Sequence, residues 1–429
     1  MENAPEPIAD ADLDTATNFG ITDTDIERGR ELLGVDLPVE DREYIRTLSH
    51  DSIRNFSYGC GNDNPLHCDP QYAASTRWGG VVAPAMMAGI VNTPMRGDPL
   101  SAGIKARTRG LFRGVHVFVS GSTWHWYRPI YSGDTLFTFR GEHSLEVKQS
   151  EFAGRSVIRV RREVKVNQRS EVVAVYELLR ILTERKKARE KGKYSAIKPA
   201  VYTEADIADI DRIYAAEEVR GASPRYWDDV AIGDSLGKMA KGPLTITDMM
   251  CFAAGGYGFG TYNPSAARLG YKNRQRIPTF YVKNAFGVPD VAQRLHWDDA
   301  WAQAIGNPMA YDYGVMRENY LYHYLSDWCG DDSIVLRVHD EIRKFNYVGD
   351  TQTILGEVTG KREENGHHAV DVTVRFTNQR GEETLRADAT IALPSRTAGL
   401  PLYPQVPVEL QQRAAAMMRR HWALSAGHP

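Results

Sequence analysis

The stretch from Asp51 to Met87 reads DSIRNFSYGCGNDNPLHCDPQYAASTRWGGVVAPAMM. It begins as a short amphipathic helix with Ile53 and Phe56 on its apolar face, and two glycines then end the helix. A turn rich in Asn, Asp and Pro leads to His67, and turns of this composition fix polar side chains at the end of an element. The apolar segment that follows, Val81–Met95, is predicted to be a long buried helix.

Several residues of this stretch fall in register with a known pattern, namely Gly61, Asn64, Pro65, Leu66, His67, Ala73, Ala74, Gly79 and Gly80. The stretch thereby resembles the hydratase motif of the MaoC-like (R-specific enoyl-CoA hydratase) and FAS1-type dehydratase family of hot-dog proteins. The family pattern is Gly-Asp-x-Asn-Pro-(Leu/Ile/Val)-His, followed by an Ala-rich turn and a Gly-Gly entry into a helix. One position departs from it, because Asn62 stands where the family has its catalytic Asp, and Asp63 is the next residue.

The chain also repeats itself. Alternating apolar runs predict antiparallel strands in both halves. The sequence Tyr-Ser-Gly-Asp-Thr that ends at Thr135 returns as Tyr-Val-Gly-Asp-Thr ending at Thr351, and helix openings at Thr22 and Thr203 also match. Two divergent copies predict an α+β double hot-dog. In this fold each of two tandem hot-dog domains has a long central helix wrapped by a curved antiparallel sheet, and the two sheets pair side by side.

These patterns divide the chain into five segments. Residues 1–20 are expected to be a flexible N-terminus, and residues 21–185 an N-terminal hot-dog domain that carries the motif. Residues 186–202 are interpreted as a charged linker, because the sequence ERKKAREKGK around its start is almost wholly charged. Residues 203–398 are expected to be a C-terminal hot-dog domain without the motif. Residues 399–429 form a tail with a basic amphipathic helix, expected to pack on a core or a neighbouring subunit.

The second copy has lost the motif. Where the first copy reads Cys-Gly-Asn-Asp-Asn-Pro-Leu-His, the second reads Gly-Tyr-Gly-Phe-Gly-Thr-Tyr-Asn-Pro, so one catalytic centre per chain is expected. The long helix of the second copy is predicted at Val315–Trp328 and is unusually polar for a central helix. Its polar side chains either face the substrate tunnel or are satisfied at a surface or interface; they are Arg317, Glu318, Asn319, Tyr322, His323 and Asp327.

Hydration of a 2-enoyl thioester needs a base for the water, a proton donor for the α-carbon and a group that holds the enolate oxygen. His67 can shuttle a proton, because imidazole titrates near neutral pH. By register with the family, the backbone amide of Ala85 at the start of the central helix would hold the enolate oxygen, with Gly80 helping the close approach. Asn64 is expected to tie the turn together and is counted with Gly80 and Ala85 as substrate-binding.

The departure at Asn62 leaves three interpretations open. Asp63 could supply the carboxylate through a shifted turn. Asn62 could orient a water that His67 alone deprotonates, since an amide cannot itself act as a general base. The site could also have left hydration for another thioester reaction or for binding only. The predicted catalytic residues are therefore His67, Asp63 and Asn62.

The composition is ordinary for a globular chain of two or three domains. Of its 429 residues, 42% are hydrophobic and 25% are charged, and the net charge of -3 gives no reason to expect nucleic acid. No secretory signal and no apolar stretch long enough to span a membrane is found, so a cytoplasmic protein is expected. The four cysteines form no CxxC pair, which favours reduced thiols over a disulfide framework or a zinc site.

The first functional hypothesis is a hydro-lyase that converts a 2-enoyl thioester and water to a 3-hydroxyacyl thioester. Its expected partners are an acyl-CoA or carrier-protein thioester as substrate, and a second subunit in a homodimer or another hot-dog protein; no metal and no other cofactor is implied. The alternative is a catalytically altered hot-dog protein that binds acyl thioesters or performs a different thioester reaction. Asn62 favours the alternative, whereas His67 and the Asn64-Pro65 turn favour the hydro-lyase, and a hot-dog thioesterase would not require that turn.

Overall fold

The computed structural model of the protein describes residues 20–41, 44–113, 115–150, 154–183, 197–257, 266–364 and 366–426. The expected flexible N-terminus, apart from its last residue, lies outside these described residues. Most of the expected charged linker and the glycine-rich residues 258–265 of the second copy lie outside them as well.

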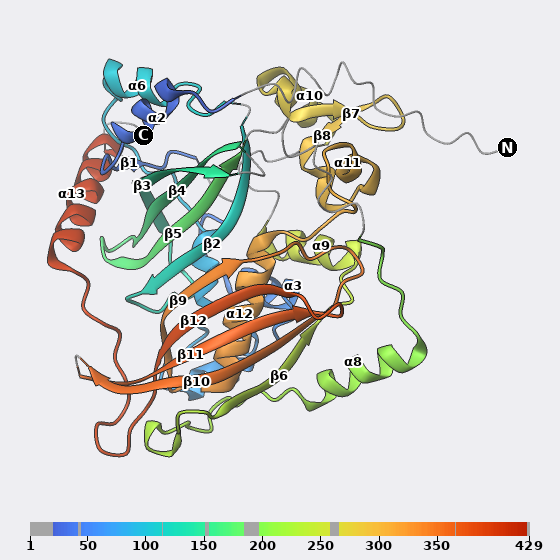
Figure 1. The fold of residues 1–429 in the computed structure, drawn as a ribbon. Helices are drawn as coiled ribbons and strands as arrows, with labels where there is room; N and C mark the ends of the chain where they lie inside the picture. Colours follow the sequence, from blue (N-terminus) through green and yellow to red (C-terminus); the bar gives the residue numbers. More distant parts are fainter. Residues whose placement is uncertain are drawn as a thin grey trace.

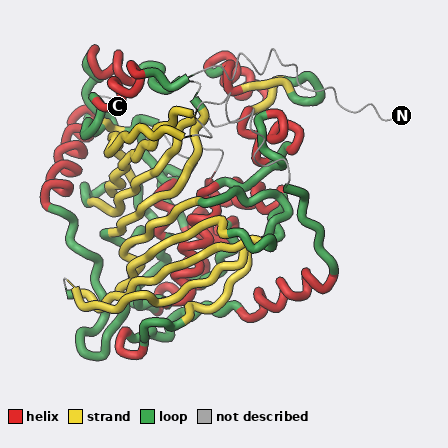
Figure 2. The backbone as a smooth tube through the Cα atoms, in the orientation of Figure 1, coloured by secondary structure: helices red, strands yellow, loops and turns green. Residues whose placement is uncertain are grey.

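A ten-stranded antiparallel sheet runs through the molecule (Figures 1 and 2), in the order β1-β3-β4-β5-β2-β9-β12-β11-β10-β6. The first half contributes β1 (Leu37–Pro38), β2 (His116–Trp126), β3 (Leu136–Ser150), β4 (Gly154–Asn167) and β5 (Val172–Thr183). The second half contributes β6 (Ser235–Lys241), β9 (Ile334–Ile342), β10 (Gln352–Glu364), β11 (His367–Asn378) and β12 (Glu383–Ala392). The halves join where β2 pairs with β9, with Thr123 opposite His339. The predicted double hot-dog, with its two sheets side by side, is confirmed.

The long helix predicted for the second half is confirmed as α12 (Gly314–Cys329). It lies behind strands β9 to β12 in Figure 1, and its apolar side chains Met316, Leu321 and Leu325 are buried in the main hydrophobic core. Charged residues of α12 are buried too, among them Arg317 and Glu318. Buried charges require partners, so this helix carries polar networks as well as core packing.

The long helix predicted over Val81–Met95 is wrong. Only a short 3-10 helix, η1 (Ala85–Gly89), forms in this segment, although most of the segment is buried as expected. Pro84 and Pro94 each disfavour helical backbone in the residue before them, and neither can donate a backbone hydrogen bond. The described part of the first half therefore has no counterpart of α12.

The motif stretch folds into three short helices, α3 (His50–Gly59), α4 (Pro65–Cys68) and α5 (Pro70–Ser75). Ser49 caps α3 with its side chain, which accepts a hydrogen bond from the backbone amide of Ser52. The second-half counterpart of α3 is α9 (Ile246–Phe252), continued by η3 (Ala253–Tyr257). The two helices pack at a glycine contact, because a Cβ at Gly59 would lie 3.1 Å from the Cα of Gly255. The corresponding helices of the two halves thus pack directly against each other.

The two Gly-Asp-Thr turns are held by the same contacts in both halves. Asp134 and Asp350 each accept a hydrogen bond, at 3.0 Å, from the backbone amide three residues earlier. Each carboxylate also forms an ion pair with an arginine of the following hairpin, Arg169 and Arg380 respectively. This repetition at the level of single contacts confirms the predicted internal repeat.

Replacing Asp350 by alanine is expected to destabilise the fold by about 2–4 kcal/mol, because the side chain is fully buried and its partner Arg380 loses both hydrogen bonds to it and keeps the one to Glu382. Asp134→Ala is the matched control and should cost less, since its partner Arg169 is 55% exposed and can be hydrated. Urea unfolding at unchanged slope measures both losses. A loss in Asp134→Ala equal to that in Asp350→Ala would contradict this expectation.

Further short elements lie around the sheet. They are α2 (Asp23–Arg30), α6 (Ala102–Thr108), α8 (Glu204–Ala216) and η2 (Trp227–Asp229). A lobe between α9 and α12, at the upper right of Figure 1, has no counterpart among the predicted elements. It consists of α10 (Ala267–Arg276), η5 (Pro278–Phe280), β7 (Tyr281–Lys283), β8 (Pro289–Val291), η6 (Ala292–His296) and α11 (Asp299–Ala304).

The predicted C-terminal helix is α13 (Val408–Ser425), which runs beside the strands of the first half (Figure 1). Its Ala414 and Met418 are fully buried in a cluster with Phe137 and Phe139 of β3. The expectation that this helix packs on a core is therefore confirmed. No helix in the described ranges combines the length and the apolar character needed to cross a membrane.

Candidate active site

His67 lies on the single turn of α4 and is 3% exposed. Its Nδ1 is 2.7 Å from the carbonyl oxygen of Val82. Because a carbonyl only accepts, Nδ1 carries the proton and Nε2 keeps a free lone pair. Nε2 is buried and has no hydrogen-bond partner among the described residues. Burial lowers the pKa of His67 to about 4, so the imidazole is neutral at pH 7 and Nε2 can accept a proton.

Asn64 forms α4 locally and also connects the two halves. Its side-chain Oδ1 accepts from the amide of Leu66 at 3.0 Å and caps the helix, while Pro65 occupies the first helical position. Since the oxygen is held by an N–H donor, the amide nitrogen must point the other way. There Nδ2 donates to Oδ1 of Asp327, on α12 of the second half, at 3.3 Å. The predicted role of Asn64 in tying the turn together is thus visible in its contacts.

Asp327 belongs to a chain of polar side chains that ends on the motif turn. Its Oδ2 lies 2.9 Å from Nε2 of His323, one helical turn earlier, although the N–H direction is not aligned with the oxygen. Nζ of Lys241, at the end of β6, lies 2.9 Å from Nδ1 of His323 and donates to the carbonyl oxygen of Gly61 at 3.3 Å. A carboxylate, an imidazole and an ammonium of the second half therefore meet the turn that carries His67.

Asn62 and Asp63 occupy different environments. Asn62 is 3% exposed, and its Oδ1 accepts from the amide of Asn64 at 3.0 Å, so this side chain stabilises the turn. Asp63 is exposed. Both line a hollow of about 470 Å³ whose other lining residues are Tyr58, Gly61, Tyr214, Glu217, Glu218, Val219, His323 and Asp327. The hollow is rich in carboxylates and reaches Asp327, whereas His67 is not among its lining residues.

The group expected to hold the enolate oxygen is not arranged as predicted. Ala85 begins the five-residue η1 rather than a long helix, so no long-helix dipole acts there. Its carbonyl accepts from the indole N–H of Trp126 at 3.2 Å. The backbone of Ala85 is also near Tyr322 of α12. Burial raises the pKa of the Tyr322 hydroxyl, and a hydrogen bond from the Ala85 backbone lowers it. A Cβ added at Gly80 would meet no other side chain or backbone atom within 4 Å.

The cysteines are free thiols, as expected: Cys60, Cys68, Cys251 and Cys329. Burial raises the pKa of Cys60, beside the motif turn, to about 12, which leaves it a weak nucleophile at neutral pH. Among the described residues no group of three or more His, Cys, Asp or Glu side chains is placed to hold a metal ion.

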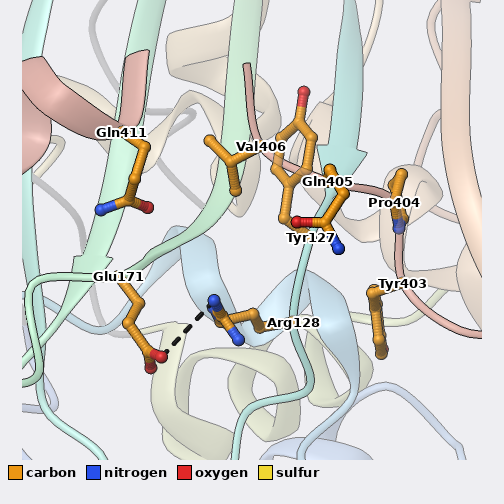
Figure 3. A pocket seen from close by; sticks show the side chains of 8 residues that line it. All are labelled: Tyr127, Arg128, Glu171, Tyr403, Pro404, Gln405, Val406 and Gln411. Atoms are coloured by element: carbon orange, nitrogen blue, oxygen red, sulfur yellow. Dashed lines mark ion pairs between the residues drawn. The ribbon is translucent and has the colours of Figure 1, made fainter. Parts of the chain in front are cut away.

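A second hollow, of about 490 Å³, lies between the end of β2 and the segment before α13 (Figure 3). Its lining residues are Tyr127, Arg128, Glu171, Tyr403, Pro404, Gln405, Val406 and Gln411. Arg128 points at Glu171 and forms an ion pair with it at 3.4 Å. No motif residue lines this hollow, and its one arginine is neutralised, so the first hollow is the better candidate for the approach to the site.

The structure thus brings together His67, Asn62 and Asn64 from the predicted set, with Asp63 at the rim of the hollow. It adds Lys241, His323 and Asp327. The last two were noticeable in the sequence only as polar residues of an unusually polar helix, four positions apart and so on one face. Lys241 carried no such signal, because it is one of many lysines and its place at the end of β6 is set by strand pairing.

The chain is similar to one family model and to several solved structures. Residues 39–176 match the family described as the FAS1-like dehydratase domain region. Among solved structures, a MaoC-like dehydratase is 17% identical, with 84% of this chain and 98% of that chain covered and a TM-score of 0.55. A MaoC-like dehydratase from Phytophthora capsici is 9% identical, with 86% and 99% covered and a TM-score of 0.48. No curated protein matches the chain.

A conserved hypothetical protein from Mycobacterium tuberculosis, described as having a double hot-dog fold, is 12% identical, with 84% of this chain and 96% of that chain covered and a TM-score of 0.45. At these low identities the structural likeness concerns the fold, and it extends over both halves of the chain. The family match covers the motif turn, the segment after it and most of the first-half strands. Residues 39–176 are therefore similar to the FAS1-like dehydratase domain region, and the chain as a whole has the double hot-dog fold, which it shares with a MaoC-like dehydratase.

Proposed function

We propose that this protein is a hydro-lyase that reversibly adds water to a 2-enoyl thioester and forms a 3-hydroxyacyl thioester. The observation that carries the proposal is the neutral, buried His67, whose Nδ1 is held by Val82 while Nε2 is free to accept a proton. An imidazole that serves only to stabilise a turn would be expected to use both of its nitrogen atoms.

In the proposed reaction, Nε2 of His67 takes one proton from water as the water oxygen bonds to the β-carbon of the enoyl group. The imidazolium then returns a proton to the α-carbon, so water has added across the double bond and the enzyme is restored. The protein's own side chains contribute only proton transfers to this addition. The thioester is carried by coenzyme A or by the arm of a carrier protein. The protein assembles as a homodimer or with a second hot-dog subunit.

Replacing His67 by alanine is expected to lower the hydration rate by about 10²–10⁴-fold, the usual range for loss of a general acid–base group. The measurement follows the loss of conjugated enoyl-thioester absorbance with a short and a bulky enoyl-CoA. Glu357→Gln, which changes an exposed carboxylate on β10 outside the hollow, is the control and should keep the wild-type rate. A His67→Ala variant as active as the wild type would refute the role of His67.

A thioester-binding protein without hydration is the second candidate. Two observations favour it: Asn62 replaces the expected acid, and Nε2 of His67 is closed to solvent, so a substrate reaches it only after neighbouring side chains move. A wild-type protein that binds an enoyl-CoA in calorimetry but leaves its absorbance unchanged would establish this candidate in place of the hydro-lyase.

A further inference from the structure

The motif turn itself offers no buried carboxylate to work with His67. Asn62 has an amide, and its oxygen is already used by the backbone of Asn64. Asp63 is exposed, at the rim of the hollow. A buried carboxylate does touch the turn from inside the protein: Asp327, which is 6% exposed and accepts a hydrogen bond from Asn64.

We infer that Asp327, on α12 of the second half, is the carboxylate that acts with His67 of the first half on the substrate water. This inference rests on the proposed function and names a residue that the motif does not contain. Asp327 is held by Asn64, three residues before His67, and it also lines the hollow through which water can reach the turn. The site is thus assembled from both copies of the repeat.

The negative charge of Asp327 acts on the His67 imidazole. Burial is the main influence on the His67 imidazole and disfavours its charged form, whereas the negative charge of Asp327 favours that form and His323 opposes it. A carboxylate whose charge stabilises the imidazolium assists the step in which His67 takes up the proton. The same carboxylate can accept a hydrogen bond from the second O–H of the water and so orient the attacking lone pair.

Lys241 and His323 are the residues that position Asp327. An ammonium group only donates, so Nδ1 of His323 accepts from Lys241 and the proton of the neutral imidazole sits on Nε2, the atom nearest Asp327. Burial lowers the pKa of His323, and the neighbouring Lys241 lowers it further, which keeps this imidazole neutral. The chain from Lys241 to Asp327 therefore places an ammonium group and a neutral imidazole next to a carboxylate that would otherwise be buried without compensation.

The step balances with these groups alone. The water oxygen bonds to the β-carbon and Nε2 of His67 takes one water proton, while the second proton stays on the oxygen and is held by Asp327. The electron pair of the double bond moves to the α-carbon and thioester carbonyl, and the imidazolium then gives its proton to the α-carbon. Asp327 remains a carboxylate throughout, so no further reactant is needed.

The test compares the wild type with Asp327→Asn and with the double variant Asn62→Asp/Asp327→Asn on the enoyl-CoA that the wild type hydrates best. Asp327→Asn is expected to lower kcat by about 10²–10³-fold with KM changed less than about threefold. The double variant returns a carboxylate to the turn from the position of Asn62, and it should recover at least about tenfold of that loss. A merely structural role of Asp327 would not allow this recovery.

Further variants test the positioning role of Lys241 and the alternative that Asp63 supplies the carboxylate. Lys241→Met should lower kcat more than it raises KM, because it disturbs the position of Asp327 and not the binding of the acyl group. Lys238→Met, which changes an exposed lysine of the same strand outside the hollow, is the matched control. Asp327→Asn with wild-type kcat, or Asp63→Asn with the larger loss, would overturn the inference while His67→Ala still tests the proposed function. A wild type without any hydration activity would instead overturn the proposed function. Thermal unfolding of each variant shows whether it is folded, and the double variant supplies the decision if Asp327→Asn is not.

Discussion

Replacing Arg317 by leucine is expected to destabilise the protein by about 3–5 kcal/mol, the cost of leaving one member of a buried ion pair behind. Nε of Arg317 lies 2.9 Å from Oδ2 of Asp312, and both side chains are about 2% exposed. The guanidinium also donates to the backbone carbonyls of Lys344 and Thr384, which fixes the start of α12 against two strand ends. Burial raises the pKa of Asp312 to about 6, and the charge of Arg317 opposes this rise. Without Arg317 the buried carboxylate loses the cation beside it.

Urea unfolding of four proteins measures this effect: the wild type, Arg317→Leu, Asp312→Asn and the double variant. The double variant should be more stable than Arg317→Leu, because the neutral amide no longer needs a cation beside it. Single and double variants of equal stability would mean that the buried carboxylate is compensated by Asn346, which donates to Asp312 at 3.1 Å, and that Arg317 contributes through packing only.

The stability of the protein is expected to fall as the pH rises from about 5 to about 8, because of two buried carboxyl groups where the halves meet. Glu318 of α12 accepts from the indole of Trp124 at 3.4 Å, and Asp340 of β9 accepts from the hydroxyl of Ser122 at 2.6 Å. One oxygen of each carboxyl has no partner among the described residues. Burial raises the pKa of both groups, and the charge of Asp340 raises that of Glu318 further.

The sign follows from proton binding. A carboxyl group with a raised pKa keeps its proton in the folded state at pH values where the unfolded chain has lost it, so stability is fully present below the ordinary carboxyl range and declines above it. One retained proton contributes about 1.4 kcal/mol per pH unit, which amounts to about 4 kcal/mol over this window. Glu318→Gln keeps the shape without the charge and should flatten the decline of the melting temperature with pH. Parallel curves for the variant and the wild type would contradict the prediction.

Local features of the fold were predictable from the sequence because short segments determine them. The Gly-Asp-Thr turns need an aspartate that accepts from a backbone amide three residues earlier, and that requirement is visible in both copies. The failure over Val81–Met95 has a physical reason. An apolar run shows that a segment is buried without showing its backbone conformation. Pro84 and Pro94 interrupt helical backbone in this segment, and the short η1 forms between them.

The candidate site divides in the same way. His67 and Asn64 were singled out in the sequence by a turn whose pattern resembles a known motif, and this turn is local, because Asn64 caps α4 through Leu66, two residues later. Asp327 is 263 residues from Asn64 in sequence, and only the edge-to-edge joining of the two sheets brings α12 to the motif turn. The sequence marked α12 as unusually polar but left open whether its polar side chains faced a tunnel or an interface. Such a long-range contact depends on the whole topology and not on any local pattern.

The meeting of one copy's turn with the other copy's helix has a consequence for the stoichiometry of the protein. A symmetric pair of first halves would contain two motif turns and, in the described residues, no long central helix, whereas a pair of second halves would contain two such helices and no motif turn. Because the two copies are joined in one chain, the first copy supplies the motif turn and the second copy supplies the long helix. The halves can no longer be exchanged for one another, and a chain contains one such junction, however many chains assemble.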